Sequence, residues 1–411
     1  MDYNPRKLEE KLDNWMNREE ILLIKGPRQS GKTTLLKHLR DKYGGTYVTL
    51  EDEDALYSFD KSPKEFIKRF DDNKIYIDEA QYCEKVGKTL KFFYDSYQDK
   101  KFVVTGSGSF DVKVEVGKYL VGRGIYFELF PLDFEEFLMW KARDLHKIFI
   151  DYKRGLTDFI LEQGKIDTTP AFGREFMELT EEFILFGGFP AIVKEDDEEI
   201  KKQLLKNLVR TYIEKDVFFF FDIRHLEKFR NLLSYMSFNI GSLMEISSIS
   251  AELDMDYRTI ENDISILSQT YVIYMLSPFH RNLSTELKKS KKLYFIDTGL
   301  RNSILNNFIP LKNRLDRGHL FENFIFEEIL KNIDGKINYW RTTGKAEVDF
   351  ILGIDNKLIP IEVKSQPGLS RGFLSFLKAY KPRRAVVFNE KEFSIKKIGN
   401  TDVAFVPYFY I

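Results

Sequence analysis

The sequence predicts an α/β protein with several domains, because two of its segments place polar groups at the ends of apolar strands and two others alternate as paired strands do. Residues 21–24 form an apolar run that leads into a glycine-rich loop at 26–33, and leucines at helical spacing follow. A second run at 74–77 ends in two adjacent carboxylates. Two alternating segments, 347–352 and 358–364, have the pattern of paired strands. A chain of 411 residues is long enough for two or three domains, each with its own core.

The order of these patterns divides the chain into four expected parts. Strands and helices alternate over residues 1–140, and a mainly helical stretch, a lid or linker, follows at 141–235. Residues 236–300 show a helix, a turn, a second helix and a strand, which is the outline of a winged helix. Residues 301–411 contain the paired strands and form an α/β tail.

Composition excludes several classes of protein. The chain has 63 basic and 64 acidic side chains, so any surface that binds nucleic acid must be local. A single cysteine, Cys83, excludes an internal disulfide and fits a reducing compartment. The apolar runs are too short to span a bilayer, and the N-terminus lacks signal-peptide character. We therefore expect a cytoplasmic protein without membrane contact.

The glycine-rich loop reads GxxxxGKT, the pattern of a phosphate-binding loop. In such a loop backbone N–H groups close around the phosphates, Lys32 neutralises charge on the β and γ phosphates, and Thr33 offers a ligand to Mg²⁺. The helix that follows adds its positive N-terminal end. The sequence therefore predicts that ATP and Mg²⁺ bind here. The predicted nucleotide-binding residues are Gly26, Pro27, Arg28, Gln29, Ser30, Gly31, Lys32, Thr33 and Thr34.

Asp78 and Glu79 follow the second strand and supply the groups that hydrolysis needs. Ligands of a parallel sheet collect at the C-terminal ends of its strands. We therefore expect Asp78 to hold Mg²⁺ and Glu79 to polarise the attacking water. The alternative for such a pair is the N-cap of an ordinary helix.

Two further segments offer candidates for the same reaction. A third strand ends at Thr105, and either Thr105 or Ser107 could sense the γ-phosphate; a plain Gly/Ser loop is an equally good interpretation. Arg123 lies between two glycines and is a candidate arginine finger, in cis or on a neighbouring subunit of a homo-oligomer. A surface arginine in a turn explains the same pattern equally well.

The expected winged helix gives a mixed signal for DNA. Its second helix has Glu261 and Asp263 against Arg258 alone, so we expect this helix to repel a phosphate backbone and to pack or contact protein. Basic residues cluster at 281–292, among them Lys292, and resemble a wing that touches phosphates. A solvated run of charge is the more common meaning of such a cluster.

The paired strands of the tail bring acidic side chains together. With a two-residue turn at 355–356, Asp349 lies opposite Glu362 and Glu347 faces Lys364. Opposed carboxylates destabilise a sheet, so a bridging Mg²⁺ or Mn²⁺ would resolve the conflict. Lys364 would then position a water or stabilise a phosphate.

Glu322 lies on an amphipathic helix upstream of these strands and could complete the acidic cluster. The alternative is an ordinary charged hairpin at the edge of a sheet, with solvated side chains. Asp349 followed by Glu362-Val363-Lys364 resembles the PD-(D/E)xK core of restriction-endonuclease-like nucleases, although Val348 stands where that family has proline.

The whole chain is similar to the prokaryotic and archaeal AAA+ ATPases of the AAA_14 type that have a C-terminal DUF4143 domain. This resemblance implies a RecA-like ATPase core, a winged helix and a nuclease-like tail. Its landmarks are the phosphate-binding loop, Tyr76-Ile77-Asp78-Glu79-Ala80-Gln81, Val104-Thr105-Gly106-Ser107, Gly122-Arg123, Phe130-Pro131-Leu132, Gly187-Gly188-Phe189-Pro190 and Tyr294-Phe295-Ile296-Asp297-Thr298-Gly299-Leu300.

Two functions are compatible with these patterns. In the first, ATP drives a motor that remodels branched or broken DNA, and the tail binds or cuts it. In the second, an ATP-dependent switch acts on a protein partner through an inactive tail. The acidic residues and lysine of the tail favour DNA, whereas the acidic second helix and the neutral net charge favour a protein.

Overall fold

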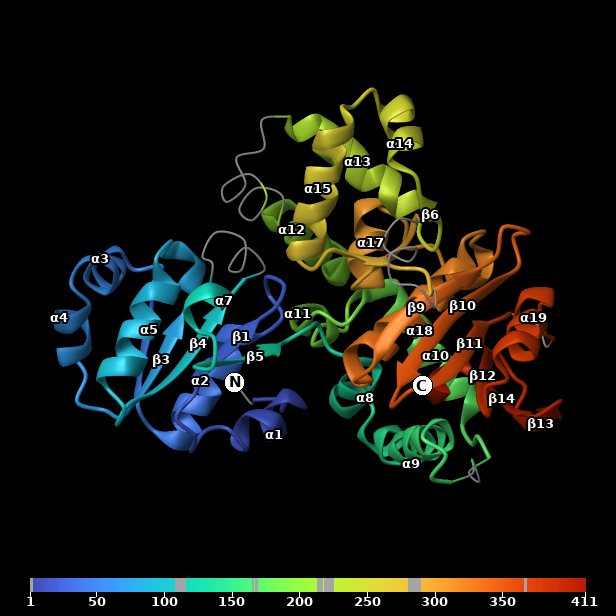
Figure 1. Cartoon of the computed structure of the whole chain (residues 1–411), viewed down its shortest axis with the longest axis horizontal. Helices are drawn as coiled ribbons and strands as arrows, with labels where there is room; N and C mark the ends of the chain where they lie inside the picture. The colour runs from blue at the N-terminus through green and yellow to red at the C-terminus, as the bar shows by residue number, and fades with distance from the viewer. Residues whose placement is uncertain are drawn as a thin grey trace.

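The computed structural model describes residues 3–107, 116–164, 166, 169–212, 217, 225–279, 290–365 and 368–411. Within them the chain forms three β-sheets covered by helices. Figure 1 shows the N-terminal sheet at one end of the molecule, the C-terminal sheet at the other end, and a mainly helical lobe above and between them. The α/β class predicted from the sequence is confirmed.

The N-terminal sheet has five parallel strands in the order β2-β3-β4-β1-β5. Because side chains alternate along a strand, Leu23 packs in one apolar cluster with helix α5 and Leu22 packs in another with α2. Both faces are thus covered, and the C-terminal ends of β1, β3 and β4 meet at one edge. The elements are β1 (Ile21–Lys25), β2 (Thr46–Thr49), β3 (Lys74–Asp78), β4 (Lys101–Gly106), β5 (Gly124–Glu128), α1 (Leu8–Asp13), α2 (Lys32–Tyr43), α3 (Glu53–Lys61), α4 (Pro63–Lys68), α5 (Val86–Ser96) and α7 (Val116–Tyr119).

The C-terminal sheet has six strands in the order β13-β14-β12-β11-β10-β9. Phe350 and Ile361 face the core under helix α18, whereas Ile351 packs with α19 on the other face. Phe350 pairs with Ile361 and Ile354 with Lys357, so the predicted hairpin register is confirmed. The elements are β9 (Lys336–Arg341), β10 (Glu347–Ile354), β11 (Lys357–Val363), β12 (Arg384–Asn389), β13 (Ser394–Ile398), β14 (Thr401–Pro407), α18 (Arg317–Asn332) and α19 (Arg371–Tyr380).

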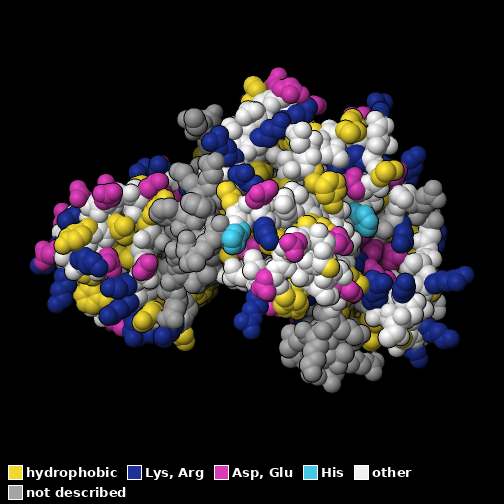
Figure 2. All heavy atoms as spheres, turned by 90° about the horizontal axis from the view of Figure 1, so that it is seen from above, with side chains coloured by type: hydrophobic (Ala, Val, Ile, Leu, Met, Phe, Trp, Pro, Cys, Tyr) yellow, Lys and Arg dark blue, Asp and Glu magenta, His cyan; other side chains and the backbone are white. Residues whose placement is uncertain are grey.

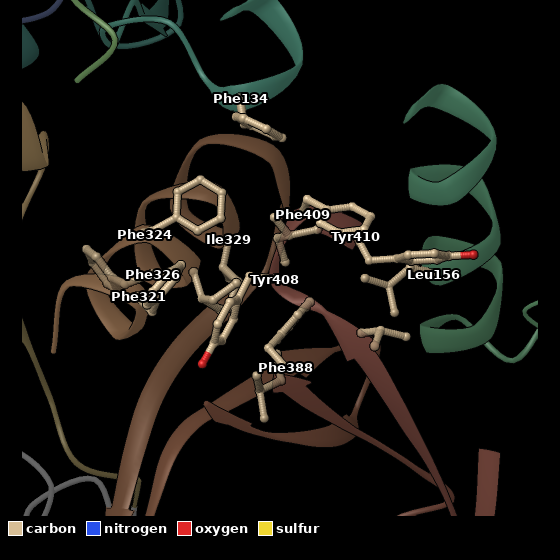
Figure 3. Packing of buried hydrophobic residues seen from close by; sticks show 14 of the residues in the cluster. Phe134, Leu156, Phe321, Phe324, Phe326, Ile329, Phe388, Tyr408, Phe409 and Tyr410 are labelled. Atoms are coloured by element: carbon tan, nitrogen blue, oxygen red, sulfur yellow. The ribbon is translucent and has the colours of Figure 1, made fainter. Parts of the chain in front are cut away.

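Helices α8 (Phe134–Lys141), α9 (Arg143–Ile160) and α10 (Gly173–Phe186) share a core with the C-terminal sheet. The sequence suggested a lid or linker for the region that begins at residue 141. Figure 3 shows Phe134 and Leu156 of these helices facing Phe324 of α18 and Tyr410 of the C-terminal segment. The Phe134 and Phe324 rings meet edge to face, with 5.6 Å between their centroids. The apolar stripes of α8, α9 and α10 therefore complete the C-terminal domain.

The third sheet, in the order β6-β8-β7, shares an apolar cluster with helices that include α13, α14 and α15, which is the arrangement expected of a winged helix. Helix α15 begins after Asp256, whose carboxylate accepts from the backbone N–H groups of Arg258 and Thr259. The elements of this lobe are α11 (Pro190–Val193), α12 (Glu198–Thr211), α13 (Leu226–Phe238), β6 (Leu243–Met244), α14 (Ile246–Leu253), α15 (Tyr257–Gln269), β7 (Ile273–Leu276), β8 (Lys291–Phe295) and α17 (Thr298–Ile304).

The structure corrects two charge arguments drawn from the sequence. Asp263 is buried, so it is not part of the exposed face of α15 and does not oppose a phosphate backbone there. Lys292 is also buried, so it is not an exposed basic residue of a wing. Arg281, Lys288 and Lys289 of the same basic cluster lie outside the described residues.

A search of the described helices finds none that is long and apolar enough to cross a membrane.

Candidate functional site

The phosphate-binding loop joins the C-terminal end of β1 to the first turn of α2. Gly31 has a φ of 99° and caps α2, a conformation that favours glycine. A Cβ on Gly26 would lie 2.2 Å from the carbonyl oxygen of Leu129, so only glycine fits there. Lys32 is buried, and its Nζ donates to the carbonyl oxygens of Gly26 (3.0 Å) and Pro27 (2.7 Å). The side chain of Lys32 thus folds back over the loop, where it would neutralise the charge of a bound phosphate.

The loop fits a phosphate group. The hydroxyl of Ser30 is buried and has no hydrogen-bond partner among the described residues. A buried hydroxyl without a partner is costly, and an oxyanion inside the loop would satisfy it. Thr33, the residue expected to offer a ligand to Mg²⁺, is half-buried on the first turn of α2, whereas Gln29 and Thr34 are exposed.

Asp78 ends β3 and accepts hydrogen bonds from both neighbouring strands. Its carboxylate accepts from the hydroxyl of Tyr47 on β2 (2.8 Å) and from the hydroxyl of Thr105 on β4. Asp78 and Thr105 are both buried. Thr105, a candidate sensor of the γ-phosphate, therefore orients the carboxylate that would hold Mg²⁺.

Glu79 follows Asp78 with a left-handed backbone, φ 54°. Its carboxylate accepts from the side-chain amide of Gln81, and the carbonyl oxygen of that amide accepts from the backbone N–H of Ser107 (3.0 Å). Burial raises the pKa of Glu79, and the nearby ammonium of Lys32 opposes this rise. Ser107, the other candidate sensor, is buried beside this pair. The structure thus brings Lys32, Asp78 and Glu79 together. Thr105 and Ser107, the two candidate sensors, lie next to them.

Arg123 lies away from this group. It precedes β5, and Gly124 pairs with Ile21 at the start of β1, whereas the phosphate-binding loop follows the other end of that strand. The five residues of β1 place its two ends about 13 Å apart. The Nε of Arg123 lies 2.8 Å from a carboxylate oxygen of Asp95 on α5. The in-cis form of the arginine-finger interpretation is therefore incompatible with this arrangement.

The acidic side chains of the tail lie near one another, but lysines pair with them. Lys364 Nζ lies 2.9 Å from an oxygen of Glu362, and Asp349 accepts from the backbone N–H of Val363 (2.8 Å). The other oxygen of Glu362 is buried without a partner in the described structure. Burial, followed by repulsion from Glu322 and Glu362, raises the pKa of Asp349 well above its usual range.

Lys292 occupies the centre of this acidic cluster, which the sequence did not reveal. Its Nζ lies 3.2 Å from Glu322 and 2.5 Å from Glu347. Although burial alone would raise the pKa of Glu322, Lys292 and the hydrogen bonds from His319 and Tyr294 lower it to about 2. Glu347 thus pairs with Lys292 and, at 3.2 Å, with Arg341, and the expected contact with Lys364 is not formed.

The ion pair with Lys292 argues against Glu322 as a third metal ligand, because the ammonium of Lys292 already neutralises the carboxylate of Glu322. In the part of the chain that the structure describes, no group of three or more His, Cys, Asp or Glu side chains could together hold a metal ion. A metal ion in the tail, in addition to the Mg²⁺ expected at the ATPase site, would have Asp349 and Glu362 as its only carboxylate ligands from this cluster.

Three sequence landmarks meet in one joint between the N-terminal sheet and the rest of the chain. Gly188 donates from its backbone N–H to Asp297 (2.7 Å), and its carbonyl oxygen accepts from the N–H of Leu132 (2.8 Å). A Cβ on Gly187 would lie 2.1 Å from a carboxylate oxygen of Asp297. Pro190, in the same turn, lies 3.7 Å from the position that a Cβ would take on Gly31. The three motifs therefore have a structural role, and the turn at 187–190 lies against the phosphate-binding loop through Pro190.

Comparison with protein families identifies three matched regions. The AAA domain family matches residues 18–138, and the DUF4143 family, a domain of unknown function, matches residues 317–409. A further domain of unknown function, DUF8612, matches residues 177–309. The resemblance to AAA ATPases with a DUF4143 domain is confirmed, and these matches say nothing of a nuclease.

Similar proteins include two that are named only as uncharacterized. One, from Methanocaldococcus jannaschii, is 27% identical over 82% of this chain and 73% of its own length. The other, from Haemophilus influenzae, is 24% identical over 84% of this chain and 82% of its own length.

Two solved structures show limited overall overlap. One is a signal transduction ATPase with numerous domains and a tetratricopeptide repeat sensor, from Pyrococcus horikoshii, with a TM-score of 0.29 and 14% identity. The match covers 81% of this chain and 46% of that protein. AMPPCP-bound DnaA from Aquifex aeolicus has a TM-score of 0.26 at 16% identity, with 64% of this chain and 86% of DnaA covered.

Proposed function

We propose that this chain, a member of the AAA-domain proteins with a C-terminal DUF4143 domain, is a Mg²⁺-dependent ATP hydrolase that remodels branched or broken DNA. The observation that supports hydrolysis is the convergence of Lys32, Asp78 and Glu79 at one edge of the N-terminal sheet. The phosphate-binding loop follows the C-terminal end of β1, and the two carboxylates lie at the C-terminal end of β3. Strand β4 lies between β1 and β3 in the sheet.

Each of these residues has a role that its position supports. Lys32 would exchange its two carbonyl partners for phosphate oxygens, and Thr33 and Asp78 would hold Mg²⁺. Mg²⁺, when bound, neutralises negative charge on the phosphate oxygens. Glu79 would accept the proton of the attacking water, and its raised pKa makes it a stronger base than an exposed glutamate.

Two features support DNA as the substrate of the motor. The lobe of α14, α15 and the third sheet has the arrangement of a winged helix, and with Asp263 buried the exposed face of α15 is close to neutral. In the tail, Asp349 and the unpaired oxygen of Glu362 lie together, which suits a nuclease-like site with one Mg²⁺ or Mn²⁺.

A protein partner is the alternative function, and Lys292 favours it. This buried lysine neutralises Glu322 and Glu347 from within, as expected for a binding domain that has no cutting activity. Figure 2 shows acidic and basic side chains interspersed over the described part of one face, without a broad basic patch. In that case ATP would switch the DUF4143 domain between two affinities for a protein.

The steady-state ATPase rate with Mg²⁺ tests both functions. We would measure it alone and with single-stranded, duplex, forked and four-way DNA at two salt concentrations, with Lys32→Ala as the inactive control. Stimulation by one DNA shape that is lost at high salt supports the DNA motor, because phosphate contacts release counterions. A rate that no DNA changes contradicts it and leaves the protein-directed switch. No turnover above Lys32→Ala contradicts hydrolysis itself.

A further inference from the structure

Residues 3–9 contact both the phosphate-binding loop and helix α2 of the proposed ATPase site. Glu9 anchors this segment: its carboxylate accepts from the backbone N–H of Arg6 (2.7 Å) and from the hydroxyl of Tyr3. The imidazole of His38 on α2 lies 3.2 Å from Glu9 and stacks on the ring of Tyr3, with 3.7 Å between centroids. The segment is thus attached to the helix that starts at the phosphate-binding loop.

Arg6 connects that loop to helix α8. Its guanidinium donates to the carbonyl oxygen of Ser30 (2.7 Å), to that of Phe130 (2.8 Å) and to both carboxylate oxygens of Glu136 (3.0 and 3.2 Å). Only 7% of Arg6 is exposed. Glu136 in turn forms a capping box with Asp133 at the start of α8. Arg6 thus links the loop at Ser30 to the first turn of α8 through a single side chain.

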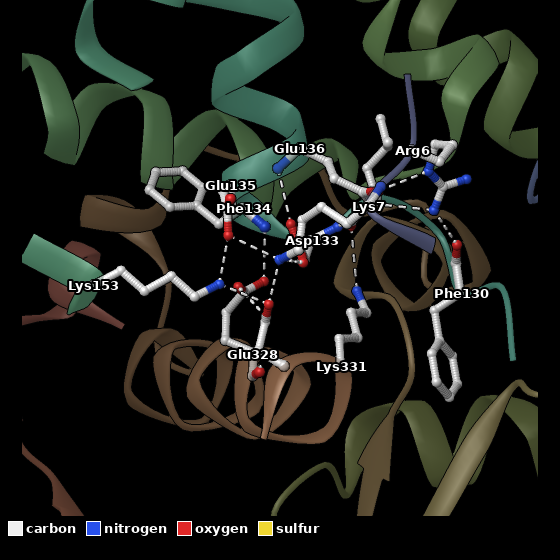
Figure 4. Close-up of polar contacts among 12 residues, drawn as sticks. Arg6, Lys7, Phe130, Asp133, Phe134, Glu135, Glu136, Lys153, Glu328 and Lys331 are labelled. Atoms are coloured by element: carbon white, nitrogen blue, oxygen red, sulfur yellow. Dashed lines mark hydrogen bonds and ion pairs between the residues drawn. The ribbon is translucent and has the colours of Figure 1, made fainter. Parts of the chain in front are cut away.

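The next residue, Lys7, extends the connection to the DUF4143 domain. Its ammonium lies 2.5 Å from Asp133 and 2.8 Å from Glu135 of α8, and it donates to the side-chain carbonyl of Asn332 at the end of α18 (2.5 Å). Figure 4 shows Lys7, Asp133 and Glu135 together with Glu328 of α18 pointing into one junction. Glu328 accepts from the backbone N–H of Phe134 (2.9 Å), which ties the two helices from the other side.

We propose that Arg6 is a positioning residue of the ATPase site, and that residues 3–9 transmit nucleotide binding from the phosphate-binding loop to helix α18. The proposal deepens the proposed ATPase function and rests on it. Arg6 touches a backbone carbonyl of the loop, so it acts on a bound nucleotide through the backbone of the loop. It therefore prepares the loop for phosphate, and its loss weakens ground-state and transition-state binding alike.

Arginine is required for this role, because its planar fork reaches Ser30, Phe130 and Glu136 at once, which a lysine cannot do. Lys7 serves only the second half of the connection, since its contacts are to α8 and α18. The two residues can therefore be separated by experiment. Arg6→Lys should change nucleotide binding and transmission, and Lys7→Met should change transmission alone.

The test combines ATPase kinetics with hydrogen exchange of the full chain, with and without Mg²⁺ and a non-hydrolysable ATP analogue. In the wild-type protein the analogue should change amide exchange both in α2 and in α18. Arg6→Lys should raise KM for ATP by about tenfold with a much smaller change in kcat, and should lose the response in α18. Lys7→Met should keep KM within about twofold and reduce the same response, because Lys153 and Glu328 still join α8 to α18.

Arg154→Lys is the matched control, because Arg154 is an exposed arginine of α9 that pairs with Asp151 on the same helix. It should behave as wild type in both measurements. An α18 response of wild-type size in both Arg6→Lys and Lys7→Met overturns the transmission, and an unchanged KM in Arg6→Lys overturns the positioning role. If Arg6→Lys does not fold, Lys7→Met decides the transmission. A wild-type protein that does not bind the analogue overturns the ATPase function as well.

Discussion

The backbone at Glu79 is strained, and the side chain of this residue points toward Gln81. A glutamate with φ 54° occupies the left-handed region, which costs about 1 kcal/mol or more for a residue with a side chain. The hydrogen bond from Gln81 holds the carboxylate there, and the adjacent peptide N–H of Glu79 donates to Asp78 (3.0 Å). Glu79 thus faces Gln81 while Asp78 faces Tyr47 and Thr105, which suits the proposed division between a base and a metal ligand.

Glu79→Gln should retain nucleotide binding and lose hydrolysis by about 10²- to 10⁴-fold, because the amide cannot accept the proton of water. The measurement is phosphate release together with binding of a fluorescent ATP analogue. Glu84→Gln, an exposed glutamate nearby, should have no effect. Hydrolysis by Glu79→Gln at the wild-type rate would show that the base is another group.

The pH dependence of hydrolysis follows from the same residue. Burial raises the pKa of Glu79, and a general base must be deprotonated. The rate of the wild-type protein should therefore begin to fall, as pH is lowered, above the usual pKa of a glutamate. A pH–rate profile of kcat shows this limb directly, and a flat profile down to the ordinary range would contradict the assignment.

A second buried carboxyl, Asp263 of α15, provides a test of stability. Burial raises its pKa to about 6. Because the folded protein holds this proton more tightly than the unfolded chain does, the stabilisation is complete below the unfolded pKa and is lost as pH rises towards 6. Asp263→Asn should gain about 1–2 kcal/mol relative to wild type between pH 4.5 and 7.5, measured by urea unfolding. The exposed Glu261→Gln should show no such trend.

At the scale of elements, the joint between the turn at 187–190 and α17 depends on close backbone approach. Gly187→Ala should destabilise the protein by about 3 kcal/mol or more, because φ is 74° and the new Cβ would collide with the buried Asp297. Gly318→Ala on α18, where no atom lies within 4 Å, should be neutral or slightly stabilising. Thermal unfolding of the two variants compares them. Equal melting temperatures would mean that the joint tolerates a side chain.

The element pair β8 and α18 offers another comparison, through Lys292. Lys292→Met should cost about 3–5 kcal/mol, because it leaves Glu322, whose side chain is 13% exposed, without its ammonium partner, whereas Glu347 keeps Arg341. Lys291→Met, on the exposed neighbour in β8, should cost almost nothing. Adding Glu322→Gln to Lys292→Met should recover part of the loss. If Mg²⁺ or Mn²⁺ instead stabilises Lys292→Met, the acidic cluster has kept its capacity for metal.

At the scale of the whole molecule, separate apolar clusters predict separate unfolding. The clusters on the two faces of the N-terminal sheet share no residue with the cluster of the C-terminal sheet. We expect more than one calorimetric transition, and an ATP analogue at 100 times its Kd should stabilise the transition of the N-terminal sheet by about 2.7 kcal/mol. Lys32→Ala should remove this shift. A single transition that moves as a unit would show that the joint makes the molecule fully cooperative.

Local patterns explain why much of the site could be predicted from the sequence. The phosphate-binding loop, the carboxylates after β3 and the hairpin register of β10 and β11 depend on neighbours a few residues apart. Glycine spacing, the alternation of apolar residues and the two-residue turn determine them. A sequence without its fold therefore indicates a nucleotide site and the α/β class.

Only the tertiary structure decided which charges are buried and what they meet. Arg6 meets Glu136 across 130 residues, and Lys7 meets Asn332 across 325. In the sequence, Lys292 and Asp263 look like their solvated neighbours Lys291 and Glu261, because burial depends on packing between distant elements. The joint and the pairing in the tail were therefore decided by long-range packing, whereas the nucleotide site was determined by short-range pattern.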